Sequence, residues 1–242
     1  MIQAPSPNHD ARTLPVSLLV LHYTGMESGT AALARLSDAD AKVSAHYLVE
    51  EDGRVFQLVE EDRRAWHAGV GEWRGITNVN SASIGIEIVN GGHNFPNDDG
   101  SLPEFPDAQI NALIPLCKAI LERHAITPGG IVGHSDIAPE RKNDPGEAFP
   151  WAGLAAAGIG VWPGEGTGDR RVLFRPGERD RGVAVAQRGL ALIGYGVGVT
   201  GALDATTEAV LRAFQRRFRP QVVDGALDME TLDLIGRVTR QV

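Results

Sequence analysis

Two histidines and one aspartate carry side chains that could bind a metal ion together. His22 and His134 each follow a short apolar run that predicts a buried strand, and Asp144 lies in a polar loop further along the chain. Side chains at strand ends project from a rigid support, which a metal site needs. Two imidazoles and one carboxylate would give Zn²⁺ three protein ligands and leave the fourth position for water, as in catalytic zinc sites. The alternative for either histidine alone is a hydrogen-bonded residue of the core.

Glu87 is a candidate general base. Residues 83–89 alternate isoleucine with other residues, which predicts a strand with the isoleucines on one face and Glu87 on the other. Gly85 and Val89 share the face of Glu87, so we expect this face to be partly covered. Desolvation raises the pKa of a carboxylate and suits it to accept a proton from a metal-bound water. The alternative is a carboxylate that points at solvent.

The composition argues against other classes of function. The 242 residues carry a net charge of −8, whereas a nucleic-acid partner requires a basic face. The densest basic stretch is Arg216-Arg217 with Arg212 and Arg219 nearby, which we interpret as a solvated helix face. Cys117 is the single cysteine, so no intramolecular disulfide can form, and its apolar neighbours predict a small buried residue. A serine hydrolase has little support, because no Gly-x-Ser-x-Gly motif is present.

The amino terminus shows no basic start and no apolar stretch before a cleavage site, so no secretory signal is predicted. No run of apolar residues is long enough to span a bilayer. We therefore expect a cytoplasmic protein, with a periplasmic location as the alternative if a leader has been removed. Nothing in the sequence requires more than a monomer.

The elements that must position these side chains are short strands mixed with helices. Strands are predicted at residues 16–21, 45–49, 55–59, 83–89 and 130–133, and helices at 31–42 and 107–123. Asp52-Gly53 predicts the turn of a hairpin, and Pro115 predicts a kink in the second helix. This mixture predicts an α/β fold with a mixed central β-sheet flanked by helices.

A change of composition after Trp162 predicts a second domain. Residues 164–179 have the composition of a linker, which divides the chain into residues 1–163 and residues 180–242. The second part contains a repeat, Gly201-Ala202-Leu203-Asp204 and Gly225-Ala226-Leu227-Asp228, in which each aspartate is predicted to cap a helix. We expect this part to be a small three-helix domain.

Successive motifs resemble those of the zinc-dependent N-acetylmuramoyl-L-alanine amidases, the type-2 family that shares a fold with peptidoglycan recognition proteins. The motifs are Leu21-His22-Tyr23-Thr24, Ser44-Ala45-His46-Tyr47, Trp66-His67-Ala68-Gly69, Ser83-Ile84-Gly85-Ile86-Glu87, Gly133-His134-Ser135-Asp136-Ile137-Ala138-Pro139 and Arg141-Lys142-Asn143-Asp144-Pro145-Gly146. They occur in the family's order between about residues 16 and 162. Residues 183–235 are similar to the three-helix peptidoglycan-binding module that is often attached to wall hydrolases.

The resemblance implies a role for each matching position. His22, His134 and Asp144 would hold one Zn²⁺ per chain. Glu87 would be the general base, and Lys142 would stabilise the oxyanion, with a surface ion pair as the alternative for this lysine. Further residues would line the cleft and contact the substrate, although a purely structural role is an equal alternative for the two histidines among them: His46, His67, Trp73 and Asn80.

The resemblance also implies an activity: hydrolysis of the amide between the lactyl group of N-acetylmuramic acid and L-alanine, in muropeptides or peptidoglycan. The rival is a non-catalytic peptidoglycan sensor that retains zinc. Relatives that only bind peptidoglycan have typically lost a metal ligand, whereas all three ligand positions are filled here, together with Glu87 and Lys142. We therefore favour the enzyme.

Overall fold

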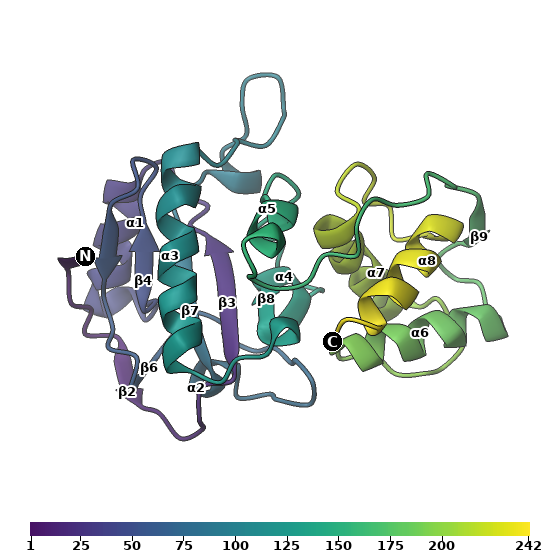
Figure 1. The fold of residues 1–242 in the computed structure, drawn as a ribbon, viewed down its shortest axis with the longest axis horizontal. Coiled ribbons are helices and arrows are strands. Elements are labelled where there is room, and N and C mark those ends of the chain that lie inside the picture. Colours follow the sequence, from purple (N-terminus) through teal and green to yellow (C-terminus); the bar gives the residue numbers. More distant parts are fainter.

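The computed structural model describes residues 1–242, and the first part of the chain is built on a six-stranded sheet (Figure 1). The strands lie in the order β1-β5-β4-β7-β3-β8, and only β4 and β5 pair antiparallel. The strands are β1 (Ile2–Gln3), β3 (Leu18–Tyr23), β4 (Tyr47–Val49), β5 (Val55–Gln57), β7 (Ser83–Ile88) and β8 (Ile131–Gly133). The predicted mixed sheet and hairpin are confirmed.

Helix α3 (Asp107–Arg123) covers one face of this sheet (Figure 1). Its Leu113, Cys117 and Ile120 are fully buried in a cluster that includes all three isoleucines of β7. Burial raises the pKa of the Cys117 thiol to about 12, as expected for a packing residue. Helix α3 continues through Pro115 as a single element. The isoleucines point towards α3, so Glu87 projects from the opposite face, as the alternation predicted.

The first helix is shorter than predicted. Helix α1 spans Gly29–Ser37, and residues 39–41 form a separate 3₁₀ turn instead of continuing it to residue 42. Asp38 explains the break, because it has extended backbone angles and its carboxylate accepts a hydrogen bond from the Asp40 N–H. A short polar side chain of this kind competes with the helix for backbone donors.

Smaller elements complete the first part of the chain. They are β2 (His9–Ala11), which pairs with β6 (Arg63–Ala65), the short helices α2 (Val79–Ala82), α4 (His134–Ile137) and α5 (Trp151–Ala156), and 3₁₀ turns at Gly92–Asn94 and Pro128–Gly130. None of the helices in the structure combines the length and the hydropathy needed to cross a membrane.

The C-terminal module contains the three predicted helices, α6 (Arg181–Ile193), α7 (Ala205–Phe218) and α8 (Met229–Thr239). As predicted, Asp204 and Asp228 cap α7 and α8 by accepting from the N–H groups of Thr207 and Thr231. The loop before each cap is held by a glutamine that is fully buried. The Gln187 amide oxygen accepts from the N–H groups of Thr200 and Gly201, at 2.9 and 2.8 Å. Gln215 does the same for the second copy of the repeat.

The segment predicted as a linker packs onto this module. Residues 164–179 contain strand β9 (Val172–Phe174), which pairs antiparallel with β10 (Leu227–Asp228). The Glu230 carboxylate accepts from the N–H of Gly168, which fixes the segment further. The position of the boundaries at 163 and 180 as limits of folding units stays a prediction.

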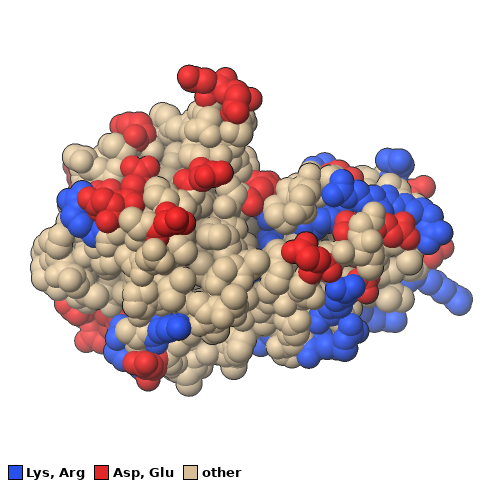
Figure 2. Space-filling view, turned by 45° about the horizontal axis from the view of Figure 1, so that its top comes forward, with Lys and Arg blue, Asp and Glu red and all other residues tan.

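The module and the sheet share one hydrophobic core. A cluster of 25 buried residues joins Leu18, Val20 and Val132 of the sheet to the helices of the module, which lie beside β8 in Figure 1. On the face shown in Figure 2, arginine side chains gather on the module, while Asp and Glu are more frequent over the first part of the chain. The interpretation of Arg216, Arg217 and Arg219 as a solvated face is wrong, because all three are buried against acidic partners.

The buried glutamines lead to a test of the module's stability. Replacing Gln187 with Met would remove the acceptor of the Thr200 and Gly201 N–H groups and the buried donor to the Ala202 carbonyl, so we expect the free energy of unfolding to fall by about 1–3 kcal/mol. Urea denaturation of the full chain measures this change. Arg188→Met is the control, because Arg188 is exposed, and its unfolding should stay within about 0.5 kcal/mol of the parent. Unfolding of Gln187→Met at the parent's urea concentration would contradict this role.

Candidate metal centre and active site

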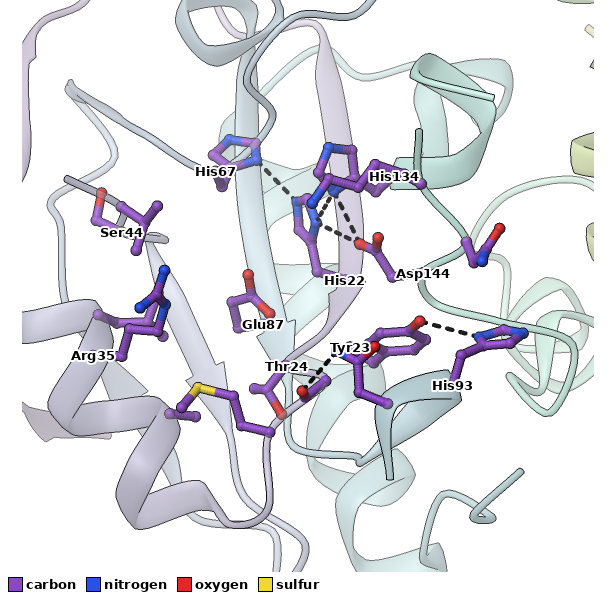
Figure 3. Close-up of a pocket in the computed structure, with 18 of the residues that line it drawn as sticks. His22, Tyr23, Thr24, Arg35, Ser44, His67, Glu87, His93, His134 and Asp144 are labelled. Atoms are coloured by element: carbon purple, nitrogen blue, oxygen red, sulfur yellow. Dashed lines mark hydrogen bonds and ion pairs between the residues drawn. The ribbon is translucent and has the colours of Figure 1, made fainter. Parts of the chain in front are cut away.

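Three neighbouring parallel strands bring His22, Glu87 and His134 to one edge of the sheet. His22 in β3 is in register with Glu87 in β7, and Leu21 is in register with Gly133, the last residue of β8. His134 follows Gly133 directly as the first residue of α4. Since the carboxyl ends of parallel strands meet at one edge, three segments distant in sequence deliver their side chains to one place (Figure 3). The loop that carries Asp144 is tied to the same edge by the Ser135 N–H, which donates to the Asp144 carbonyl at 2.9 Å.

Three side-chain atoms converge on one point. The Nδ1 atoms of His22 and His134 lie 3.0 Å apart, and the Asp144 Oδ2 lies 2.9 Å from the first and 3.0 Å from the second. Donor atoms around a tetrahedral zinc ion lie about 3.3 Å apart, given bonds of about 2.0–2.1 Å. Two imidazole nitrogens and a carboxylate oxygen at nearly this spacing can hold a metal ion, and all three residues are buried. The structure thus brings the predicted ligands together.

The second nitrogen of each imidazole has its own partner, which frees Nδ1 for a metal. His134 Nε2–H donates to the carbonyl of Ala68 at 2.9 Å. His22 Nε2 lies 3.0 Å from His67 Nδ1, and His67 Nε2 lies 3.1 Å from the Ser83 hydroxyl. The Ser83 hydroxyl donates to the Val79 carbonyl at 2.6 Å. Each proton in this series of hydrogen bonds therefore points away from the metal position, from His22 Nε2 to His67 and from His67 Nε2 to Ser83. Such partners fix the tautomer and the orientation of a metal-binding histidine.

The protonation states also suit a metal site. Burial, together with the neighbouring His134, lowers the pKa of His22 to about 4, so this imidazole is neutral at neutral pH. Burial alone would raise the pKa of Asp144, but contacts with His134 and His22 hold it well below its usual range. A neutral imidazole and an ionised carboxylate are the forms that bind metal ions.

Glu87 stands beside this cluster with one carboxylate oxygen free. Its Oε2 is buried and has no hydrogen-bond partner. Burial raises the pKa of Glu87 well above its usual value, the nearby Asp144 raises it further, and Lys142 opposes both. A carboxylate whose proton affinity has been raised in this way can accept a proton from a water molecule in the site.

These residues line a single pocket with a volume of about 360 Å³ (Figure 3). Lys142 is half-buried in its wall and forms no ion pair, so the alternative of a surface ion pair is not what the structure shows. Arg35, on α1, is exposed at the same pocket, and Tyr23 and His93 form part of the wall beside Asp144. Tyr23 and His93 are joined by a contact of 3.1 Å between the hydroxyl and Nδ1.

Of the four predicted substrate contacts, only His67 lies in the pocket wall. The expectation for His46 needs correction: it is fully buried, and its Nδ1 accepts a hydrogen bond from the Gly85 N–H. Trp73 is 1% exposed, packs against Tyr195 and donates from its indole to the Gly129 carbonyl, so it belongs to the contact with the module. Asn80 accepts from the N–H groups of His67 and Ala68, which makes it a support for His67.

Sequence reasoning missed several supporting residues. Ser83 and Ala68 lie inside the motifs quoted above, yet nothing in their type indicates that they help to orient His22 and His134. Arg141 donates to the carbonyl of Ala68 and thereby holds the acceptor of His134. The sequence shows only that His93 lies in a glycine-rich loop. This context does not predict that His93 lines the pocket.

Comparison with known proteins assigns the class. Residues 12–147 match the family model described as N-acetylmuramoyl-L-alanine amidase, and residues 179–235 match the one described as "Putative peptidoglycan binding domain". The chain belongs to the N-acetylmuramoyl-L-alanine amidase family.

Two named amidases are similar to this chain. The chain is 41% identical over 226 residues to the N-acetylmuramoyl-L-alanine amidase AmiD of Escherichia coli, covering 89% of this chain and 79% of AmiD. It is 37% identical over 167 residues to the 1,6-anhydro-N-acetylmuramyl-L-alanine amidase AmpD of Enterobacter cloacae, covering 61% of this chain and 84% of AmpD.

Solved structures agree. AmiD of E. coli in complex with the substrate anhydro-N-acetylmuramic acid-L-Ala-D-γ-Glu-L-Lys superposes with a TM-score of 0.78 at 37% identity, covering 96% of this chain and 92% of AmiD. AmpDh3 of Pseudomonas aeruginosa superposes with a TM-score of 0.76 at 39% identity, covering 93% of this chain and 91% of AmpDh3. Both matches include the module as well as the sheet.

The partner of His22 provides a test of the metal centre. His67→Phe keeps a ring of similar size but removes the acceptor of the His22 Nε2–H, so we expect the affinity for Zn²⁺ to fall about 10- to 100-fold. Competition with a chromophoric chelator measures this affinity. The control is His124→Phe, because His124 pairs with Glu61 away from the pocket. Equal affinities in the parent and His67→Phe would show that His67 does not support the ligand.

Proposed function

We propose that the chain is a zinc-dependent amidase that cleaves the bond between the lactyl group of N-acetylmuramic acid and the L-alanine of the stem peptide. The observation that carries this proposal is the convergence of two imidazole nitrogens and a carboxylate oxygen beside a free carboxylate in one pocket. Membership of the amidase family and the similarity to AmiD and AmpD support it.

Zinc is the metal that this donor set fits best. Two nitrogens and one oxygen leave an open position in a tetrahedral geometry, the arrangement of catalytic zinc sites. When bound by His22, His134 and Asp144, zinc would supply Lewis acidity towards the scissile carbonyl and a lowered pKa for a water molecule.

Glu87 and Lys142 perform the remaining chemistry. Glu87 accepts a proton from the attacking water through its free oxygen and then delivers it to the nitrogen of the leaving L-alanine. Lys142 lies in the pocket wall and forms no ion pair, so its ammonium can stabilise the negative charge that develops on the carbonyl oxygen. The water oxygen ends in the lactyl carboxylate, and the peptide leaves with a free amino group.

Muropeptides or peptidoglycan are the substrates that we propose. A solved structure of AmiD contains an anhydro-muropeptide as its substrate, and the C-terminal module matches the family model described as "Putative peptidoglycan binding domain". The cytoplasmic location and the monomeric state stay predictions.

The first test separates the enzyme from a zinc-retaining sensor. Purified protein should release peptide from an anhydro-muropeptide, lose this activity after treatment with a chelator, and regain it with one equivalent of Zn²⁺. Parallel assays on intact sacculi would show whether the enzyme prefers free muropeptides or the intact wall. Binding of the muropeptide without release of peptide, in zinc-loaded and metal-free protein alike, would favour the sensor.

The second test isolates the proton transfer. Glu87→Ala should retain zinc, because Glu87 is not a ligand, and lose about 10²- to 10⁴-fold in kcat. Zinc content measured by atomic absorption, together with steady-state kinetics, distinguishes this outcome from loss of the metal. Activity of the variant equal to that of the parent would remove Glu87 from the mechanism.

A further inference from the structure

A turn that carries a proposed metal ligand is held from outside by the C-terminal module. Helix α4 is a single turn, His134–Ile137, and its Asp136 carboxylate is 1% exposed. The Asp136 Oδ2 accepts from the N–H of Gly133, which closes the turn around His134. The position of His134 therefore depends on what fixes the Asp136 carboxylate.

Two residues of the module fix that carboxylate. The Tyr195 hydroxyl donates to Asp136 Oδ1 at 2.6 Å, and Arg217 Nη1 donates to Oδ2 at 2.7 Å. The other terminal nitrogen of Arg217 donates to the Ile131 carbonyl at 3.0 Å, so one guanidinium holds both β8 and α4. Its guanidinium carbon lies over the Trp151 ring, 4.1 Å from the ring centroid. These contacts cross between segments more than 50 residues apart.

The neighbouring arginine reaches the other ligand loop. Arg216 Nε donates to Glu147 Oε1 at 3.0 Å, and Glu147 Oε2 lies 3.0 Å from His93 in the pocket wall. Glu147 follows the Asp144 ligand by three residues. Two successive residues of α7 thus contact both segments from which the metal ligands on this side of the site come.

We propose that the module is a positioning part of the metal centre, with Arg217 and Tyr195 as the residues that hold the His134 turn in its metal-binding geometry. This inference rests on the proposed function only in taking His22, His134 and Asp144 as the zinc ligands. A module whose only task was to bind the wall would not need buried charges directed at the ligand turn. Groups that orient a ligand from outside the coordination shell affect metal affinity in other zinc proteins, and here Asp136 links Arg217 and Tyr195 to the backbone of the His134 turn.

The chain contains its own matched control. Arg219 is 3% exposed, compared with 4% for the side chain of Arg217, and it donates to the buried Asp228 at 2.8 Å. Its partners, Asp228 and Asp224, belong to the module. Arg217→Met and Arg219→Met therefore each remove one buried arginine–aspartate pair at the end of α7, but only the first touches the ligand turn.

The experiment compares zinc affinity in these two variants of the full chain. By chelator competition, Arg217→Met should bind Zn²⁺ about 10- to 100-fold more weakly than the parent. Arg219→Met should stay within about twofold of the parent, although urea denaturation should show that both variants are less stable. The visible spectrum of Co²⁺-substituted protein reports the ligand geometry, and we expect it to change only in Arg217→Met.

Tyr195→Phe keeps the test decisive if Arg217→Met does not fold, because it removes only a hydroxyl. We expect a smaller loss of zinc affinity and a shifted Co²⁺ spectrum. Unchanged affinity and spectrum in the folded Arg217 or Tyr195 variants would overturn the proposal, and so would an equal loss in Arg219→Met, since general destabilisation would then explain it. Absence of zinc binding in the parent itself would instead contradict the proposed function.

Discussion

The candidate site depends on two imidazole nitrogens and a carboxylate oxygen that are held about 3 Å apart in a buried position. Such a cluster is costly to assemble, since burial penalises charge and the side chains lose conformational freedom. Each of the three residues is therefore supported by further hydrogen bonds: His22 through His67 and Ser83, His134 through the Ala68 carbonyl, and the Asp144 loop through the N–H of Ser135. The parallel strands β7, β3 and β8 supply the common edge on which these supports are built.

The parts of the site that the sequence could predict are those governed by local pattern. Isoleucine alternation placed Glu87 on the face opposite the core, and apolar runs that end in histidine placed His22 and His134 at strand ends. The family's motifs indicated the third predicted ligand, Asp144. The repeated Gly-Ala-Leu-Asp predicted the caps of α7 and α8, because a cap depends on residues within one turn.

The predictions that failed concern contacts between distant segments. His46 and Trp73 lie in or near the family's motifs, but His46 is bonded to β7 and Trp73 faces the module, and neither direction can be read from neighbouring residues. Arg216 and Arg217 stand in a basic stretch that is typical of a solvated helix face, and only the packing of α7 against α4 and β8 shows that they are buried. The glycine-rich composition of residues 164–179 hid strand β9, whose partner β10 lies more than 50 residues away.

Both the proposed catalysis and the proposed role of the module require a metal ion bound by His22, His134 and Asp144. The coordination of that ion is therefore the most direct test. Zinc K-edge X-ray absorption on the full chain loaded with one equivalent of Zn²⁺ should show a four-coordinate site of nitrogen and oxygen atoms at about 2.0–2.1 Å, with the scattering pattern of two imidazoles. Asp144→Ala should change that spectrum or lose the metal. A site without imidazole scattering, or one that the Asp144 substitution leaves unaltered, would contradict the assignment of the metal to His22, His134 and Asp144.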